Sequence, residues 1–278
     1  MAMIFPLTSF LYITGIVILI ALLIACIFIP NDWQTVCLCI DFIILIAVKF
    51  LINYYAARKY NKTIPKMFSN LNDFIAEQNK FLSRRLVPKV VRNAISTNIA
   101  CAYVMYERYP EALDIYNRII NDFKRPTESF YCFLNTADIY LSLGNEPMYF
   151  NFINLTHQVL NGVRNTNLKL YSKLLSEYEI YYSVLELRRT RSVQAAQMFM
   201  DIRQRHINLE RSKKIHSKKQ AINTALPIYI LGLAYMVLGD TEQARSCFEQ
   251  IAASTEPLPY VNRTREYLKT GNEEVLWH

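Results

Sequence analysis

Residues 10–29 constrain the fold more than any other part of the sequence, because they run for 20 positions without a charged side chain. A helix rises about 1.5 Å per residue, so such a run spans the roughly 30 Å hydrocarbon core of a bilayer. A second apolar run, residues 36–52, follows a short linker and is interrupted only by Asp41 and Lys49. The pattern predicts a two-pass transmembrane hairpin in residues 1–57 that contacts the lipid bilayer.

Basic residues predict the orientation of this hairpin. Lys49, Arg58, Lys59, Lys62 and Lys66 cluster where the second run ends, whereas the linker between the runs contains no Lys or Arg. Positive charge favours the cytoplasmic side of a membrane. We therefore expect an integral, multi-pass protein of the plasma membrane, with both termini in the cytosol.

The first run has two other interpretations. A cleaved signal peptide is disfavoured because no Lys or Arg precedes the run, which is also longer than the 7–15 residues of a signal core. Residues 23–26 resemble a bacterial lipoprotein cleavage box, but no polar mature sequence follows. Asp41 lies inside the second run, where structural pairing or snorkelling is favoured over an ion pathway.

The remainder of the chain has the composition of an α-helical protein. Apolar residues make up 52% of the 278 positions, whereas Gly (6) and Pro (10) are few. This balance favours a buried core over disorder and long helices over strands and turns, so we predict an all-α fold. Residues 58–89 are predicted to be a connecting helix that ends near Pro88.

A residue pattern recurs at a helical-hairpin spacing after residue 90. In residues 225–257 it consists of Gly232, Tyr235, a turn at Gly239 and Asp240, Ala244 and Phe248, and in residues 95–120 of Ala100, Tyr103, Ala112 and Tyr116. A third copy keeps Ala137, Tyr140 and Gly144 but has Tyr149 at the second small position. A fourth, in residues 168–206, keeps only Ala195 and Phe199.

This pattern resembles the tetratricopeptide repeat over about residues 90–257. The resemblance implies small residues where the two helices of each hairpin cross and aromatic residues between hairpins. It also implies that residues 90–270 form a right-handed α-solenoid, whose first helices line a concave face that binds other proteins.

The same resemblance places candidate partner-binding residues on that face. Asn98 and Asn135 stand two positions before the small residue of their repeats, where related proteins hydrogen-bond the backbone of a bound peptide. The full predicted set is Thr97, Asn98, Tyr131, Leu134, Asn135, Asp138, Tyr229 and Leu233. An alternative for the last repeat is that a helix near residues 261–268 folds over its apolar inner face as a cap.

We therefore expect a membrane-anchored scaffold or adaptor that binds a protein or peptide partner on the cytoplasmic side. One alternative is a structural subunit assembled through the hairpin. Another is contact with anionic lipid through the basic residues 203–220. The same residues could equally be a solvated linker that binds nothing. They lack the interleaved aromatic residues of a nucleic-acid site, so nucleic-acid binding is not expected. The sequence determines neither the partner nor the oligomeric state.

Signals of catalysis are missing from the sequence. None of the four histidines lies beside an acid at a metal or triad spacing, and no Gly-rich phosphate loop, HExxH or GxSxG occurs. The six cysteines form no CxxC pair and have no histidine at zinc-ligand spacing. We expect no enzyme, no cofactor and no metal site, and a reducing compartment.

Overall fold

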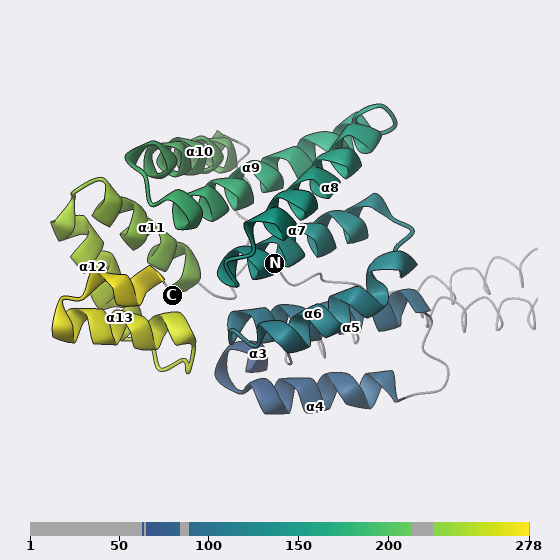
Figure 1. The fold of residues 1–278 in the computed structure, drawn as a ribbon, viewed down its shortest axis with the longest axis horizontal. Coiled ribbons are helices and arrows are strands. Elements are labelled where there is room, and N and C mark those ends of the chain that lie inside the picture. The colour runs from purple at the N-terminus through teal and green to yellow at the C-terminus, as the bar shows by residue number, and fades with distance from the viewer. Residues whose placement is uncertain (1–62, 64, 84–88, 213–224, 278) are drawn as a thin grey trace, which may run out of the picture. The chain divides into compact units, whose positions relative to one another are not determined.

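A computed structural model describes residue 63 and residues 65–83, 89–212 and 225–277. All the elements in these residues are helices, as the composition predicted, and Figure 1 shows them. They are α3 (Lys66–Ser69), α4 (Leu71–Leu82), α5 (Lys89–Met105), α6 (Tyr109–Ile119), η1 (Ile120–Asp122), α7 (Pro126–Ser142), α8 (Glu146–Arg164), α9 (Leu168–Thr190), α10 (Val193–Ser212), α11 (Ala225–Val237), α12 (Thr241–Ala252), α13 (Pro259–Thr270) and η2 (Glu273–Trp277).

The predicted transmembrane hairpin, its orientation and Asp41 lie outside the described residues. Among the helices that are described, none is long and apolar enough to cross a bilayer.

The chain divides into two compact units between residues 99 and 100, inside α5. In the described part of the first unit, α3 packs against α4, and Lys66 forms an ion pair with Glu77. Asn70 separates these two helices, because its side-chain oxygen accepts a hydrogen bond from the Asp73 amide (3.1 Å) and caps α4. Within residues 58–89, predicted as one connecting helix, the described residues 65–83 form the two helices α3 and α4.

The second unit consists of helices that pack on one another in chain order from α6 to α13. The strongest packing lies within the pairs α7 with α8 and α11 with α12, which run antiparallel in Figure 1. Helices α7 and α9, the first helices of two successive pairs, also pack on each other. Buried side chains from α7, α8 and α9 fill the space between them, namely Phe130, Leu134, Leu160, Val163, Leu174, Tyr178, Ala137, Tyr149, Phe152, Ile153 and Leu185.

Four connections between successive described α-helices each contain one residue with a left-handed backbone. These residues are Glu107 (φ 59°), Gly144 (φ 70°), Arg191 (φ 49°) and Gly239 (φ 81°). In three hairpins the next amide donates to a tyrosine carbonyl five residues earlier, which is the hydrogen bond of a Schellman turn. The pairs are Arg108 with Tyr103 (2.9 Å), Asn145 with Tyr140 (2.9 Å) and Asp240 with Tyr235 (3.0 Å). The turns predicted at Gly144 and Gly239 are confirmed.

The turns also fix the register of the repeat. Five residues after each left-handed position stands a residue that is at most 1% exposed: Ala112, Tyr149, Ala196 and Ala244. The prediction of Ala195 in the fourth copy was wrong by one residue, because the turn at Arg191 contains no glycine to mark it. The close helix crossing predicted at Gly232 is confirmed, since a Cβ atom there would lie 2.7 Å from Cε1 of Phe248.

Candidate interaction site

The structure divides the eight predicted partner-binding residues between the two compact units. Thr97 and Asn98 belong to the first unit and are buried, and the Thr97 hydroxyl donates to the Asn93 carbonyl (2.8 Å). The other six lie on α7 and α11 of the second unit. Only Tyr131 and Asp138 of the whole set are half-buried rather than buried. Binding of a partner by these eight residues stays a prediction.

Asn135 of α7 joins three helices through its side-chain amide. Its Nδ2 donates to the Tyr116 hydroxyl (3.0 Å) on α6 and to Cys101 Sγ (3.4 Å) on α5, and its Oδ1 accepts from the Tyr181 hydroxyl (3.2 Å) on α9. An amide offers two donors and one acceptor oxygen, so these three contacts engage both ends of the group. Asn135 therefore holds the repeats together.

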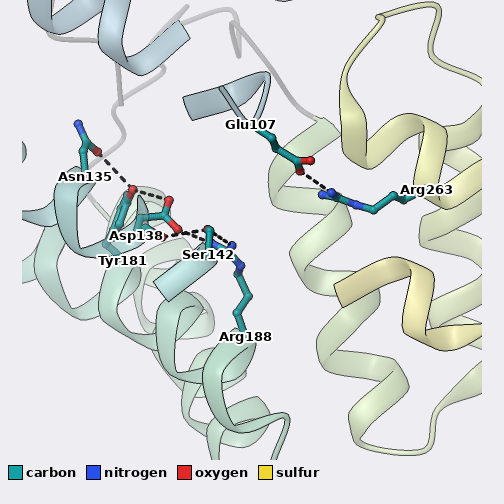
Figure 2. A network of polar contacts seen from close by, with 7 residues as sticks. All are labelled: Glu107, Asn135, Asp138, Ser142, Tyr181, Arg188 and Arg263. Atoms are coloured by element: carbon teal, nitrogen blue, oxygen red, sulfur yellow. Dashed lines mark hydrogen bonds and ion pairs between the residues drawn. The ribbon is translucent and has the colours of Figure 1, made fainter. Parts of the chain in front are cut away.

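Asp138 lies one helical turn after Asn135 and accepts hydrogen bonds from two residues of α9. The Tyr181 hydroxyl donates to Oδ2 (3.2 Å), and Arg188 Nη1 donates to Oδ1 in an ion pair. The second guanidinium nitrogen, Nη2, donates to the Ser142 hydroxyl (2.8 Å) at the end of α7. Figure 2 shows Asp138 between Tyr181 and Arg188. Asn135, Asp138, Ser142, Tyr181 and Arg188 are called the α7–α9 polar network below.

The charged pair of this network remains partly open to solvent, since the side chain of Arg188 is 28% exposed and that of Asp138 is 15% exposed. Burial opposes the positive charge of Arg188, but the Asp138 carboxylate outweighs it and holds the pKa of the guanidinium above its usual value. Burial, helped by the Asp138 charge, raises the pKa of Tyr181 well above 10. The site therefore holds an Asp138–Arg188 ion pair and a neutral Tyr181 hydroxyl at physiological pH.

Tyr131 extends the contacts between α7 and α9 toward the other end of the two helices. Its hydroxyl donates to the carboxylate of Glu177 on α9. Burial and this carboxylate both raise the pKa of Tyr131, so its hydroxyl also stays protonated. Leu134, the remaining predicted residue of α7, is 2% exposed and packs with Leu160 and Leu174.

Both predicted residues of α11 are buried, and Tyr229 contacts segments that follow in the chain. Tyr229 contacts Tyr260 of α13 (5.4 Å between ring centroids), and its hydroxyl donates to the Leu276 carbonyl of η2. Leu233 is 1% exposed. Helix α13, the helix predicted near residues 261–268, packs on α12, and Leu226 of α11 is 42% exposed, so a cap over the whole inner face stays a prediction.

Sequence reasoning missed Tyr181, Arg188 and Glu177, which supply the α9 half of the site. Tyr181 stands ten residues before the left-handed turn residue Arg191, as Tyr229 stands ten before Gly239. Counting back from the turn would have found it. However, the usual turn signal, a glycine, is replaced by arginine in this hairpin, and the long aromatic helix offered several registers.

Among the described residues, no group of three His, Cys, Asp or Glu side chains could hold a metal ion. A scan against protein-family models gave no match, and searches of curated proteins and of solved structures gave no significant match.

Proposed function

We propose that this protein is a membrane-anchored, tetratricopeptide-like scaffold that binds a protein or peptide partner on the cytoplasmic side. The observation that carries the proposal is the partly exposed Asp138–Arg188 pair, set between the first helices of two hairpins that each turn through a residue with a left-handed backbone. Helical repeats of this kind stack their own core and leave one face for other molecules.

The chemistry of the α7–α9 polar network suits an extended peptide. A guanidinium has five N–H donors, and Asp138 and Ser142 accept from two of its nitrogens. Their contacts hold the group in one orientation, so little side-chain entropy is lost when a ligand carbonyl or carboxylate accepts a further hydrogen bond. The Tyr109 hydroxyl lies near the same guanidinium and the Ser142 hydroxyl.

Co-purification with matched variants tests this proposal. The full-length chain is isolated in mild detergent as wild type, as Arg188→Gln and as Arg118→Gln. Arg118 is a control because its pair with Asp114 on α6 is exposed (67% and 69%). A partner should co-elute with wild type and Arg118→Gln and fall at least tenfold with Arg188→Gln, while all three keep the same helical circular dichroism. Equal recovery with both variants would count against the site.

The anchoring part of the proposal rests on residues 1–57 and the basic cluster that follows them. External protease applied to intact cells should leave residues 89–277 uncut, because the proposed topology places them inside. Cleavage of this region in unbroken cells would refute the cytoplasmic orientation and require an extracellular partner.

A further inference from the structure

Two of the four left-handed turn residues carry side chains, and both contact the last helical segments of the described chain. A residue with a side chain is sterically disfavoured at positive φ relative to glycine. Glu107 and Arg191 nevertheless occupy such positions, which suggests that their side chains have a structural role. The Glu107 carboxylate pairs with Arg263 of α13 (Figure 2). Arg191 contacts η2. The turn residues Gly144 and Gly239 have no side chain and can make no such contact.

Arg191 contacts η2 in two ways. Its Nη1 donates to Oε2 of Glu274 (2.7 Å), and its guanidinium lies over the ring of Trp277, with Cζ 5.0 Å from the centroid. An arginine that combines a carboxylate contact with an aromatic face distinguishes a particular sequence of side chains. The turn between α9 and α10 therefore recognises an acid three residues before a tryptophan.

Helix α11 supplies the other half of the surface that η2 contacts. Leu276, the residue before Trp277, is 1% exposed, and its carbonyl accepts from the Tyr229 hydroxyl. The Tyr229 ring contacts the rings of Phe248 (6.1 Å between centroids) and Tyr260 (5.4 Å), which makes this part of the η2 contact surface aromatic. A buried leucine, a backbone hydrogen bond and a charged contact at the rim are the elements by which a groove holds a peptide.

The rim contact is open to competition from solvent or from another chain. The side chain of Glu274 is 66% exposed and that of Arg191 is 38% exposed. Helix α13 ends at Thr270, and the left-handed backbone of the following Gly271 (φ 71°) separates η2 from the helix. The segment is thus joined to the unit by a short connection, packs on α13, and is held by side chains of the α9–α10 turn and of α11.

We propose that the surface formed by Arg191 and Tyr229 is a peptide-binding site and that η2 is its internal ligand. The external ligand is a partner segment with an acidic residue three positions before a tryptophan and a leucine directly before it. This inference deepens the proposed function and rests on it. A short tether gives η2 an effective concentration on the order of millimolar, so a free peptide binds only when it reaches a similar concentration or η2 is released.

The test releases η2 from the full chain. A protease site is inserted between Gly271 and Asn272 in the protein purified in mild detergent, and the cut segment is removed by dilution and gel filtration. The probe is a fluorescein-labelled peptide of residues 272–278, NEEVLWH, followed by fluorescence anisotropy. We expect at least tenfold tighter binding to the emptied chain than to the uncut chain.

Variants identify the site. Arg191→Ala should weaken binding of the probe to the emptied chain at least tenfold, whereas Arg245→Ala should not change it, because Arg245 forms an exposed pair with Glu249 on α12. Arg191→Glu should prefer a probe carrying Glu274→Lys over the natural probe. An emptied chain that keeps its helical circular dichroism but binds no probe, or an Arg191→Ala chain that binds normally, overturns the proposal.

A second measurement covers the case in which the emptied chain unfolds. The uncut chain is labelled with 5-fluorotryptophan, and Trp33→Phe assigns the ¹⁹F resonance of Trp277. Unlabelled NEEVLWH at several millimolar should move this resonance toward its position in the free labelled peptide. A resonance that does not move overturns the proposal. Either failure leaves the Arg188 co-purification result intact, so the two proposals can fail separately.

Discussion

Tyr181 of α9 and Tyr229 of α11 occupy the same repeat position, ten residues before a left-handed turn, but their hydroxyls bind different parts of the chain. Tyr181 donates to Asn135 and Asp138 on the preceding first helix, both at 3.2 Å. Tyr229 donates to the Leu276 carbonyl of η2. The hairpin geometry fixes the position of each tyrosine relative to the turn, whereas the element packed beside it determines which group its hydroxyl binds.

The same two helices differ in charge along this side. Glu186 and Arg188 of α9 stand at the positions of Ala234 and Met236 of α11, counted from the turns. Helix α9 therefore joins its neighbours through ion pairs, whereas α11 packs apolar and aromatic residues. Stability in the two regions should respond differently to substitution and to pH.

The largest expected effect lies in the aromatic region. Phe248 is fully buried, and its ring packs on Gly232, Tyr229 and Tyr267. Phe248→Ala should lower the free energy of unfolding by about 3–5 kcal/mol because it removes a whole ring from a packed site. Chemical denaturation of the full chain in detergent measures this. Phe150→Ala, at a residue 42% exposed, should cost much less, and equal losses would remove the distinction.

The charged region should respond next most strongly. Arg188→Leu leaves the Asp138 carboxylate, which is 15% exposed, without its cation and should cost about 1–3 kcal/mol, below the cost for a fully buried pair. Met236→Leu at the equivalent position of α11 should be nearly neutral. In a double-mutant cycle, Asp138→Leu should recover part of the loss. Simple additivity of the two losses would show that the pair is not coupled.

A pH dependence should separate the two regions further. Burial alone would raise the pKa of Glu186, but hydrogen bonds from Arg189 (2.7 Å) and the Tyr149 hydroxyl (2.9 Å) dominate and lower it below its usual 4.5. The stability this adds is present above pH 4.5 and is lost as pH falls through the lower, folded-state pKa.

Glu186→Gln tests this sign. The variant should be less stable than wild type by about 1–2 kcal/mol at pH 7, and the difference should shrink as the pH falls below 4.5. Ala234→Gly on α11 is the non-titrating control, and its difference from wild type should not depend on pH. A Glu186→Gln difference that grows in acid would reverse the assignment.

The smallest expected effect compares the two tyrosines directly. Tyr181→Phe leaves two acceptors without their donor and should lower the free energy of unfolding by about 1–1.5 kcal/mol. Tyr229→Phe leaves one acceptor without its donor and should lower it by about 0.5–1 kcal/mol. Hydrogen exchange gives a second readout. Tyr229→Phe should increase exchange at residues 273–277 alone, whereas an increase throughout α11 and α12 would mean that this hydroxyl supports the hairpin as well.

Much of the repeat could be predicted because its signals are local. Small residues such as Gly232 and Ala244 are required wherever two helices cross closely, and Gly144 and Gly239 mark turns that need a left-handed backbone. These requirements recur at fixed spacing in the sequence. The predicted register was wrong in the hairpin of α9 and α10, the fourth copy of the pattern. There Arg191 takes the place of glycine, and Ala196 rather than Ala195 lies at the helix crossing.

By itself, the sequence determined the all-helical class, the hairpin spacing and the small residues Ala112, Gly232 and Ala244 at helix crossings, because each depends on side chains a few positions apart. Only the tertiary structure decided which polar groups meet. Asp138 and Arg188 are 50 residues apart, and Glu107 and Arg263 are 156 apart. Such contacts depend on how whole helices are rotated about their axes and on how far each side chain reaches. Neither property produces a periodic pattern in the sequence that could be recognised.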